Sequence, residues 1–341
     1  MPNIMIVGGY GAVGSKIARQ LADRPDNHVI VAGRSLDRAV QVASAIGSEA
    51  RRIDLSDSTT WNAALENVNL AVVCIDQKDT AFLQALSDRG IDCVDVTAGD
   101  EFFQKAEALQ ASTAVVLSVG LAPGLSNLLA AKAVEGMEHT QAIEIGLLMG
   151  TGDEHGSAAI AWSTAQMFDP AALHDDAMVD FGPDFGNRRA YFMDFADQHV
   201  LTRTMPGVKA ITRAAYDSAL LTAALFWIGR RFAGNGWMQK LIERVSHMPT
   251  FGSDKCVLTV TTKGRIGNQP VQRTAHFFGQ KEAAVTAAMA VATAEDVLSG
   301  LIKPGIQHAH EALDAEEVVA RIEKWGHGSF AIGPIVSLVR P

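Results

Sequence analysis

Six consecutive residues near the start of the chain, Gly9-Tyr10-Gly11-Ala12-Val13-Gly14, have the GxGxxG spacing that can hold a dinucleotide. An apolar segment at 4–9 leads into them and a segment with helical spacing, 11–22, follows. Gly9 permits a tight turn, Gly11 lets a pyrophosphate approach the backbone, and Gly14 allows close contact between helix and sheet. The N–H groups that open the helix can then bind the phosphates. A glycine-rich turn without a nucleotide is the alternative.

The end of the second predicted strand, residues 28–34, favours NADP over NAD. Enzymes that use NAD place an acidic residue there, about 20 residues after the glycines, to bind the ribose 2′-hydroxyl. This chain has Gly33-Arg34-Ser35 instead. An arginine can pair with a 2′-phosphate and stack on the adenine, while a serine adds a hydroxyl. We therefore predict NADP (NADPH) as the cofactor, unless Arg34 is an ordinary surface arginine.

Other residues at the carboxyl ends of predicted strands should line the same cleft, because parallel strands end at one edge of a sheet. Those that we assign to cofactor binding are Asp54, Leu55, Cys74, Ile75, Thr97 and Pro123. Asp54 could equally cap a helix. Asp95, at the end of the fifth predicted strand, is a candidate catalytic residue. It would orient a substrate amine, or it would merely hold the following loop.

A Pro-Gly turn at 123–124 follows the sixth predicted strand and opens a helix. Ligands bind at this edge of open α/β sheets. Ser126 and Asn127 could therefore donate hydrogen bonds to the nicotinamide or to a substrate carboxylate. A simple hinge between domains is the alternative interpretation.

A proton donor that works near neutral pH is most often a histidine. Of the ten histidines, His155 has the most suggestive setting, in a loop at 150–156 with glycines at both ends, just before a predicted helix. Trp162, seven residues further on, should lie near the same helical face. We predict His155 as the catalytic acid/base, with His276 as the second candidate, although a lone histidine in a loop is more often structural.

A substrate with a carboxylate needs a cationic partner. Four arginines in the middle of the chain qualify: Arg188, Arg189, Arg203 and Arg213. We favour Arg213, because it precedes Tyr216 and Asp217 at an expected helix start. Most arginines face solvent or pair with an acid, so this assignment of a substrate-binding role is open.

Residues 1–120 alternate short apolar segments with helical ones. Strands are predicted at 4–9, 28–34, 51–55, 70–75, 93–97 and 115–119. Near-continuous apolar strands in this rhythm are typical of a parallel sheet buried on both faces. Right-handed crossovers then give a Rossmann-type, doubly wound α/β domain.

The pattern changes after the Pro-Gly turn and predicts a second, α+β domain. Its expected elements are a helix at 125–134, a strand at 141–149, an irregular region at 170–200, a mostly helical stretch at 213–242 and a hairpin formed by 256–262 and 271–278. Helices are also predicted at 281–302 and 315–325. We find no internal repeats.

These segments together resemble the saccharopine dehydrogenase-like family. The resemblance lies in residues 6–14, in Gly33-Arg34-Ser35, in 90–97, in 120–127 and in 286–305. It implies reduction of an imine, or oxidation of the secondary amine, that joins an amino acid to a carbonyl compound. It also implies a homodimer and a C-terminal segment that returns to the first domain. One departure is Val119, where saccharopine reductases carry a cysteine, so saccharopine itself is in doubt as the product.

The predicted domains are therefore 1–124, together with about 303–341, for the dinucleotide, and 125–302 for substrate binding and dimerisation.

The net charge of −9 argues against a nucleic-acid partner, which would need a basic surface. No basic, apolar leader opens the sequence, so we expect a cytoplasmic protein. The apolar stretch 218–229 has 12 residues, fewer than the roughly 20 of a membrane helix, and is expected to be a buried or dimer-interface helix. Three distant cysteines predict no metal site.

The leading hypothesis is an NADP-dependent oxidoreductase that acts on C–N bonds of a small substrate resembling an amino acid or keto acid. A second hypothesis is a reductase of C=C or C=O bonds in a hydrophobic acyl substrate, for which the apolar stretch at 219–228 would line a channel. A third is a non-catalytic sensor that binds NADP.

Overall fold

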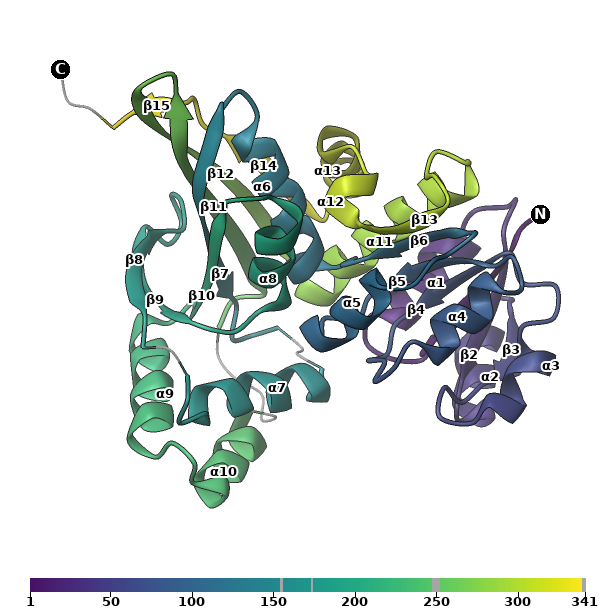
Figure 1. The fold of residues 1–341 in the computed structure, drawn as a ribbon. Coiled ribbons are helices and arrows are strands. Elements are labelled where there is room, and N and C mark those ends of the chain that lie inside the picture. The colour runs from purple at the N-terminus through teal and green to yellow at the C-terminus, as the bar shows by residue number, and fades with distance from the viewer. Residues whose placement is uncertain (154–155, 173, 247–251, 339–341) are drawn as a thin grey trace. The chain divides into compact units, whose positions relative to one another are not determined.

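The computed structural model describes residues 1–341 except 154–155, 173, 247–251 and 339–341. The chain divides into two compact units, the first of residues 1–128 and 283–325 and the second of 129–282 and 326–341. Each unit has its own sheet (Figure 1).

The sheet of the first unit has seven strands in the order β13-β6-β5-β4-β1-β2-β3. All its pairings are parallel, and helices lie on both of its faces (Figure 1). The elements are β1 (Asn3–Val7), α1 (Gly14–Ala22), β2 (His28–Gly33), α2 (Leu36–Ala45), β3 (Glu49–Arg52), α3 (Trp61–Ala64), β4 (Leu70–Val73), α4 (Ala81–Ser87), β5 (Asp92–Asp95), α5 (Asp100–Glu107), β6 (Ala114–Leu117), α11 (Glu282–Leu298), β13 (Gly305–His308), α12 (Ala309–Ala312) and α13 (Ala315–Lys324). The predicted doubly wound fold is confirmed.

The central strands of this sheet are apolar along their whole length because both faces are covered. β4 and β6 are buried at every position, and β1 at every position but its first. With helices on either side, neither face needs polar residues. Polar side chains are therefore concentrated where the strands end.

The second unit contains a mixed sheet in the order β14-β12-β11-β7-β10-β9-β8, with β15 paired to β12. β7 and β10 are parallel, and the other pairings are antiparallel. The elements are β7 (His139–Met149), α7 (Ser157–Phe168), β8 (Asp176–Asp180), β9 (Asn187–Phe192), α8 (Ala196–Thr204), β10 (Lys209–Tyr216), α9 (Ala219–Arg231), α10 (Gly236–Ser246), β11 (Lys255–Ile266), β12 (Gln269–Gln280), β14 (Gly328–Ile332) and β15 (Val336–Ser337). Helix α6 (Ser126–Val134) begins in the first unit and ends in the second.

The helical stretch predicted at 213–242 is wrong in its first part. Arg213 lies in the middle of β10, which pairs along its whole length with β7. The alanines of this segment favour a helix locally, but pairing with a long buried strand overrides so weak a preference. The helices begin only at α9, where the Ser218 hydroxyl accepts a hydrogen bond from the Leu221 N–H.

The segment that returns to the first unit is 283–325, and not 303–341 as predicted. Helix α11 belongs to the first unit, where most of its side chains are buried and the Thr286 hydroxyl accepts a hydrogen bond from the Leu121 N–H. The residues after 325 belong to the second unit, where β14 pairs with β12. The short strand β14 gave no clear signal in the sequence.

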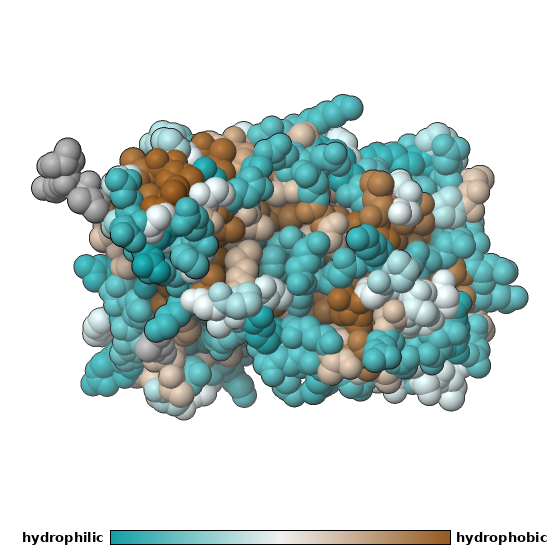
Figure 2. Space-filling view, turned by 45° about the horizontal axis from the view of Figure 1, so that its top comes forward, coloured by the Kyte–Doolittle hydropathy of each residue, from teal (hydrophilic) through white to brown (hydrophobic). Residues whose placement is uncertain are grey.

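Figure 2 shows one side of the surface, on which hydrophilic residues predominate and hydrophobic ones form separate patches. Among the described residues, no helix combines the length and hydropathy needed to cross a bilayer.

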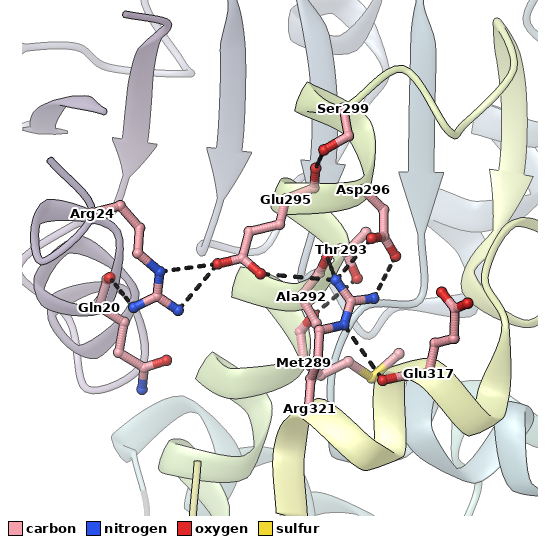
Figure 3. A network of polar contacts seen from close by, with 10 residues as sticks. All are labelled: Gln20, Arg24, Met289, Ala292, Thr293, Glu295, Asp296, Ser299, Glu317 and Arg321. Atoms are coloured by element: carbon pink, nitrogen blue, oxygen red, sulfur yellow. Dashed lines mark hydrogen bonds and ion pairs between the residues drawn. The ribbon is translucent and has the colours of Figure 1, made fainter. Parts of the chain in front are cut away.

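A network of charged side chains ties the returning segment to the first unit (Figure 3). On α11, Glu295 pairs with Arg24, which follows α1, at 3.1 Å. On α13, Arg321 donates two hydrogen bonds to Asp296, at 2.8 and 2.6 Å, and one to the Ala292 carbonyl. Because Asp296 is 8% exposed, loss of its partner would leave a poorly solvated charge.

We expect Arg321→Met to lower the free energy of unfolding by about 2 kcal/mol, because the variant keeps the apolar stem but leaves Asp296 unpaired. The measurement is urea unfolding followed by circular dichroism. Lys105→Met is the control, since Lys105 pairs with Glu101 at an exposed site and should contribute less than about 0.5 kcal/mol. Equal losses in both variants would contradict this role of Arg321.

Candidate functional site

The turn between β1 and α1 depends on glycines. Gly8 has a φ of +79°, and a Cβ there would lie 2.5 Å from Ile75 Cγ2. A Cβ on Gly14 would collide with the Gly8 carbonyl, so α1 can begin this close to the strand only without a side chain. Gly11, by contrast, is exposed. The prediction assigned the tight turn to Gly9, whereas the positive φ lies at Gly8. Gly14 has the close contact expected of it, and the approach of a phosphate to Gly11 stays a prediction.

The side chain of Tyr10 links this turn to the end of β2. Its ring lies against Gly33, where a Cβ would be 2.5 Å away, and its hydroxyl accepts a hydrogen bond from the Ser35 N–H at 3.2 Å. The Arg38 guanidinium lies over the same ring, 4.5 Å from its centroid. Ser35 itself caps α2 by accepting a hydrogen bond from the Arg38 N–H. Tyr10 therefore positions the segment that carries the arginines.

Positive charge gathers near the ends of β2 and β3. Arg34, Arg38 and Arg52 are all exposed. The Asp54 carboxylate accepts hydrogen bonds from Ser56, which lower its pKa, and Arg34 and Arg52 lower it further through their charge. Asp54 thus holds a local turn while the arginines face solvent. The exposed Gly11 and Ala12, in the turn before α1, and this cationic cluster fit the diphosphate and 2′-phosphate of NADP.

At the next strand end, Ile75 is 37% exposed, an unusual exposure for a large apolar side chain beside a buried strand. Its carbonyl accepts a hydrogen bond from the Thr97 hydroxyl at 3.3 Å, which joins the end of β4 to that of β5. Cys74 is half-buried, and burial raises the pKa of its thiol. Leu55 is half-buried as well. Ile75 can thus offer an apolar contact to a flat ring.

Asp95 is fully buried at the end of β5. It accepts hydrogen bonds from Gln77 Nε2 and from the Thr97 N–H, the latter at 2.7 Å. Burial raises the pKa of Asp95 to about 6, and the charge of Asp76 adds to the effect, while the hydrogen bonds oppose it. Of the two interpretations of Asp95, this setting favours the one in which it holds the following loop.

The turn after β6 is held by buried polar groups. Ser126 and Asn127 are both 0% exposed, and Asn127 Oδ1 accepts a hydrogen bond from the Gly124 N–H at 2.9 Å. Pro123 is buried too, and within 120–127, all of which the structure describes, only Ala122 is partly exposed. The side chains of Ser126 and Asn127 therefore stabilise the turn, and the predicted donation to a ligand would require them to become exposed.

The candidates of the second unit have different environments. His155 lies outside the described residues. Trp162, on α7, is 36% exposed and packs edge-on against Phe195, with ring centroids 4.7 Å apart. Arg213 is 7% exposed and donates two hydrogen bonds to Asp175 Oδ1, at 3.1 and 2.6 Å. Its guanidinium thus already has an acidic partner within the fold.

Three residues of this site escaped the sequence analysis. Gly8 precedes the GxGxxG spacing, and its positive φ is visible only in the structure. Arg38, in the first turn of α2, follows Arg34 by four residues, a spacing that is visible in the sequence. Gln77, next to Asp76, is buried, and its Oε1 has no hydrogen-bond partner among the described residues.

The raised pKa of Asp95 predicts a pH dependence of stability. An aspartate in the unfolded chain has a pKa of about 4. Neutral Asp95 therefore contributes fully to the free energy of folding below that pH, and this contribution is lost as the pH rises through about 6. We expect Asp95→Asn to become more stable than the native chain by up to about 3 kcal/mol at about pH 8, because its amide stays neutral and can bond a flipped Gln77.

Urea unfolding between about pH 4 and pH 8 measures this difference. The control is Asp88→Asn, an exposed aspartate of the same unit, whose difference from the native chain should stay constant over this range. If the difference in unfolding free energy between Asp95→Asn and the native chain were also independent of pH, the raised pKa of Asp95 would be contradicted.

Comparison with known proteins agrees with this geometry. Residues 4–122 match the family model of the saccharopine dehydrogenase NADP-binding domain. The prestalk A differentiation protein A of Dictyostelium discoideum is 31% identical over 118 residues, which are 34% of this chain and 35% of that protein. The match thus spans about a third of that curated relative.

The fold also matches a solved structure over nearly its full length. The apo saccharopine dehydrogenase (L-Glu forming) from Saccharomyces cerevisiae has a TM-score of 0.73 and 14% identity, with 98% of this chain and 100% of that chain covered. At this identity the match shows a shared fold. Residues 4–122 are thus similar to a saccharopine dehydrogenase-type NADP-binding domain, which agrees with the family resemblance and confirms the cofactor class inferred from the sequence.

Proposed function

We propose that the chain is an NADP-dependent oxidoreductase that acts on C–N bonds. It would reduce the imine formed by an amino acid and a carbonyl compound, or oxidise the corresponding secondary amine. The observation that carries the proposal is the NADP-binding domain, with Arg34 and Arg38 beside its glycine turn. The fold shared with a saccharopine dehydrogenase supports the C–N chemistry.

In this proposal, each part of the first unit has a defined task. The N–H groups at the start of α1 bind the diphosphate, and Arg34 and Arg38 pair with the 2′-phosphate. The exposed Ile75 side chain would hold the nicotinamide, which in its reduced form would supply the hydride that reduces an imine. Tyr10 and Thr97 keep the ends of β2, β4 and β5 in place.

The substrate nitrogen must gain a proton when the carbon gains the hydride. A general acid near neutral pH suits this step, and we propose His155, the histidine selected from the sequence. Asp95 is a positioning residue in this scheme, because its carboxylate is enclosed by Gln77 and Thr97. The homodimer and the cytoplasmic location expected from the sequence remain part of the proposal.

The role of Arg34 predicts a change of cofactor preference. We expect Arg34→Asp to weaken NADPH binding about 100-fold, because an acidic residue repels the 2′-phosphate, and to strengthen NADH binding several-fold through the 2′-hydroxyl. Titration calorimetry with both cofactors measures the ratio. Arg19→Asp, an exposed site in the last turn of α1, is the matched control and should leave the ratio unchanged. An unchanged ratio in Arg34→Asp would rule out its assigned role.

The reaction class predicts NADPH consumption by particular substrate pairs. We expect loss of NADPH absorbance when the protein is mixed with a panel of amino acids, each paired with a 2-oxo acid, and no loss with either compound alone. His155→Gln should lower kcat by about 100-fold and leave NADPH binding intact. Turnover of hydrophobic enoyl or ketoacyl substrates alone, or tight NADPH binding with no turnover, would contradict the proposal.

A further inference from the structure

Two consecutive helices of the second unit, α9 and α10, expose large apolar side chains. On α9, Leu220 is 86% and Trp227 64% exposed. On α10, Trp237 is 70% exposed, with Leu241 and Val245 beside it on the same helical face. Both helices contact α7 and lie together in Figure 1. We call these five side chains, with Ala223 and Ala224, the α9–α10 surface.

The fold of the unit does not need this surface, because α9 is anchored by its other side. Thr222, Phe226 and Gly229 are buried there. The Phe226 ring stacks on Tyr191 at 4.3 Å between centroids, and a Cβ on Gly229 would collide with the Met167 carbonyl of α7. The outward face, at 220, 223, 224 and 227, is nonetheless wholly apolar. An exposed apolar face of this kind marks a site of interaction.

Positive charge surrounds the same surface. Residues 219–246 contain Arg230, Arg231, Lys240 and Arg244 and a single acid, Glu243, a local net charge of +3 in a chain of net charge −9. Lys240 and Arg244 are exposed on the same face of α10 as Trp237. Helices that carry tryptophan and leucine next to lysine and arginine are typical of binding at a membrane interface.

A groove of about 850 Å³ runs between α9 and the strands β8 and β9. Ala223, Ala224 and Trp227 form its apolar wall. The polar lining includes the three arginines Arg189, Arg230 and Arg231 and one carboxylate, Asp176. Asp176 lies 2.6 Å from Arg189 and 3.6 Å from Arg230, and among the described lining residues it is the one acid beside three arginines, which leaves this lining a net positive charge. An anionic group with an apolar extension fits this lining.

We propose that the α9–α10 surface binds the face of an anionic lipid bilayer. Trp227 and Trp237 lie at the level of the headgroups, where indoles are enriched, and Leu220 and Leu241 reach the acyl boundary. The arginines of the groove pair with lipid phosphates, as guanidinium groups do in bidentate geometry. The protein attaches without spanning the membrane.

A second copy of the chain fits this surface less well. A two-fold interface brings the same patch of both subunits together. The exposed Arg231, Lys240 and Arg244 of both copies would then be brought into one interface, and a concentration of like charge there is unfavourable. An anionic bilayer instead complements both the apolar side chains and their charged margin.

The experiment is co-sedimentation of the full chain with vesicles. We expect apparent affinity at least about 10-fold higher for phosphatidylcholine mixed with about 30% phosphatidylglycerol than for phosphatidylcholine alone, and a decrease with added salt. Replacing both tryptophans, Trp227→Ser with Trp237→Ser, should lower the affinity for the anionic vesicles about 10-fold. Lys240→Gln with Arg244→Gln should lower the preference for the anionic lipid several-fold, while the groove arginines keep part of it.

The matched control is Val336→Ser with Leu338→Ser, which alters exposed apolar residues elsewhere in the second unit and should change nothing. Because the native chain alone already tests the lipid preference, misfolding of a variant cannot hide the answer. Equal binding to both vesicles, or to neither, would overturn the proposal. So would light scattering that shows a dimer which the tryptophan variant dissociates, because this surface would then join two copies.

Discussion

The close approach of helix α1 to strand β1 governs the geometry of the first unit. No side chain can occupy Gly14, because its Cβ would collide with the Gly8 carbonyl, and Gly8 itself adopts a φ of +79°. Because neither position carries a side chain, α1 can begin close to the end of the strand, directly after the exposed Gly11 and Ala12. Tyr10, in the same turn, then reaches Gly33 and Ser35 and so determines where the arginines of the next segment lie.

One edge of the same sheet is formed by β13, which belongs to the returning segment 283–325. Without β13, the strand β6 would expose a row of unpaired backbone groups. β13 pairs with it in parallel, and His308 at its end contacts both Ser118, at 2.7 Å, and Glu107, at 3.0 Å. Ser118 has a φ of +57°, a conformation that a serine adopts at some cost, and this hydrogen bond helps to hold it. The hydrogen bond to His308 therefore constrains the backbone at Ser118, from which the turn containing Pro123 begins.

The sequence predicts most of this first unit because its signals are local. Continuous apolar strands, the glycine spacing and Arg34 each lie within a few residues of the feature that they specify. Such reasoning fails where distant contacts or burial decide the role of a residue. Arg213 looked like the start of a helix, but a distant partner, β7, makes its segment a strand, and its guanidinium binds Asp175 at a separation of 38 residues. Ser126 and Asn127 have the right chemistry for a ligand, yet burial gives both a role in their own turn.

Net charge is a poor guide to what such a chain binds. Fields between exposed charges decay over about 8 Å at physiological ionic strength, so an anion responds to the few residues near it. The chain carries a charge of −9, yet Arg34, Arg38 and Arg52 gather beside the glycine turn, and Arg189, Arg230 and Arg231 line one groove of the second unit. The acidic balance argues against a long polyanion, which would cover many surface charges at once. The acidic balance does not prevent a small anion from binding at Arg34, Arg38 and Arg52. It also allows a charged surface to bind at Arg189, Arg230 and Arg231, because such a surface contacts only one face of the second unit.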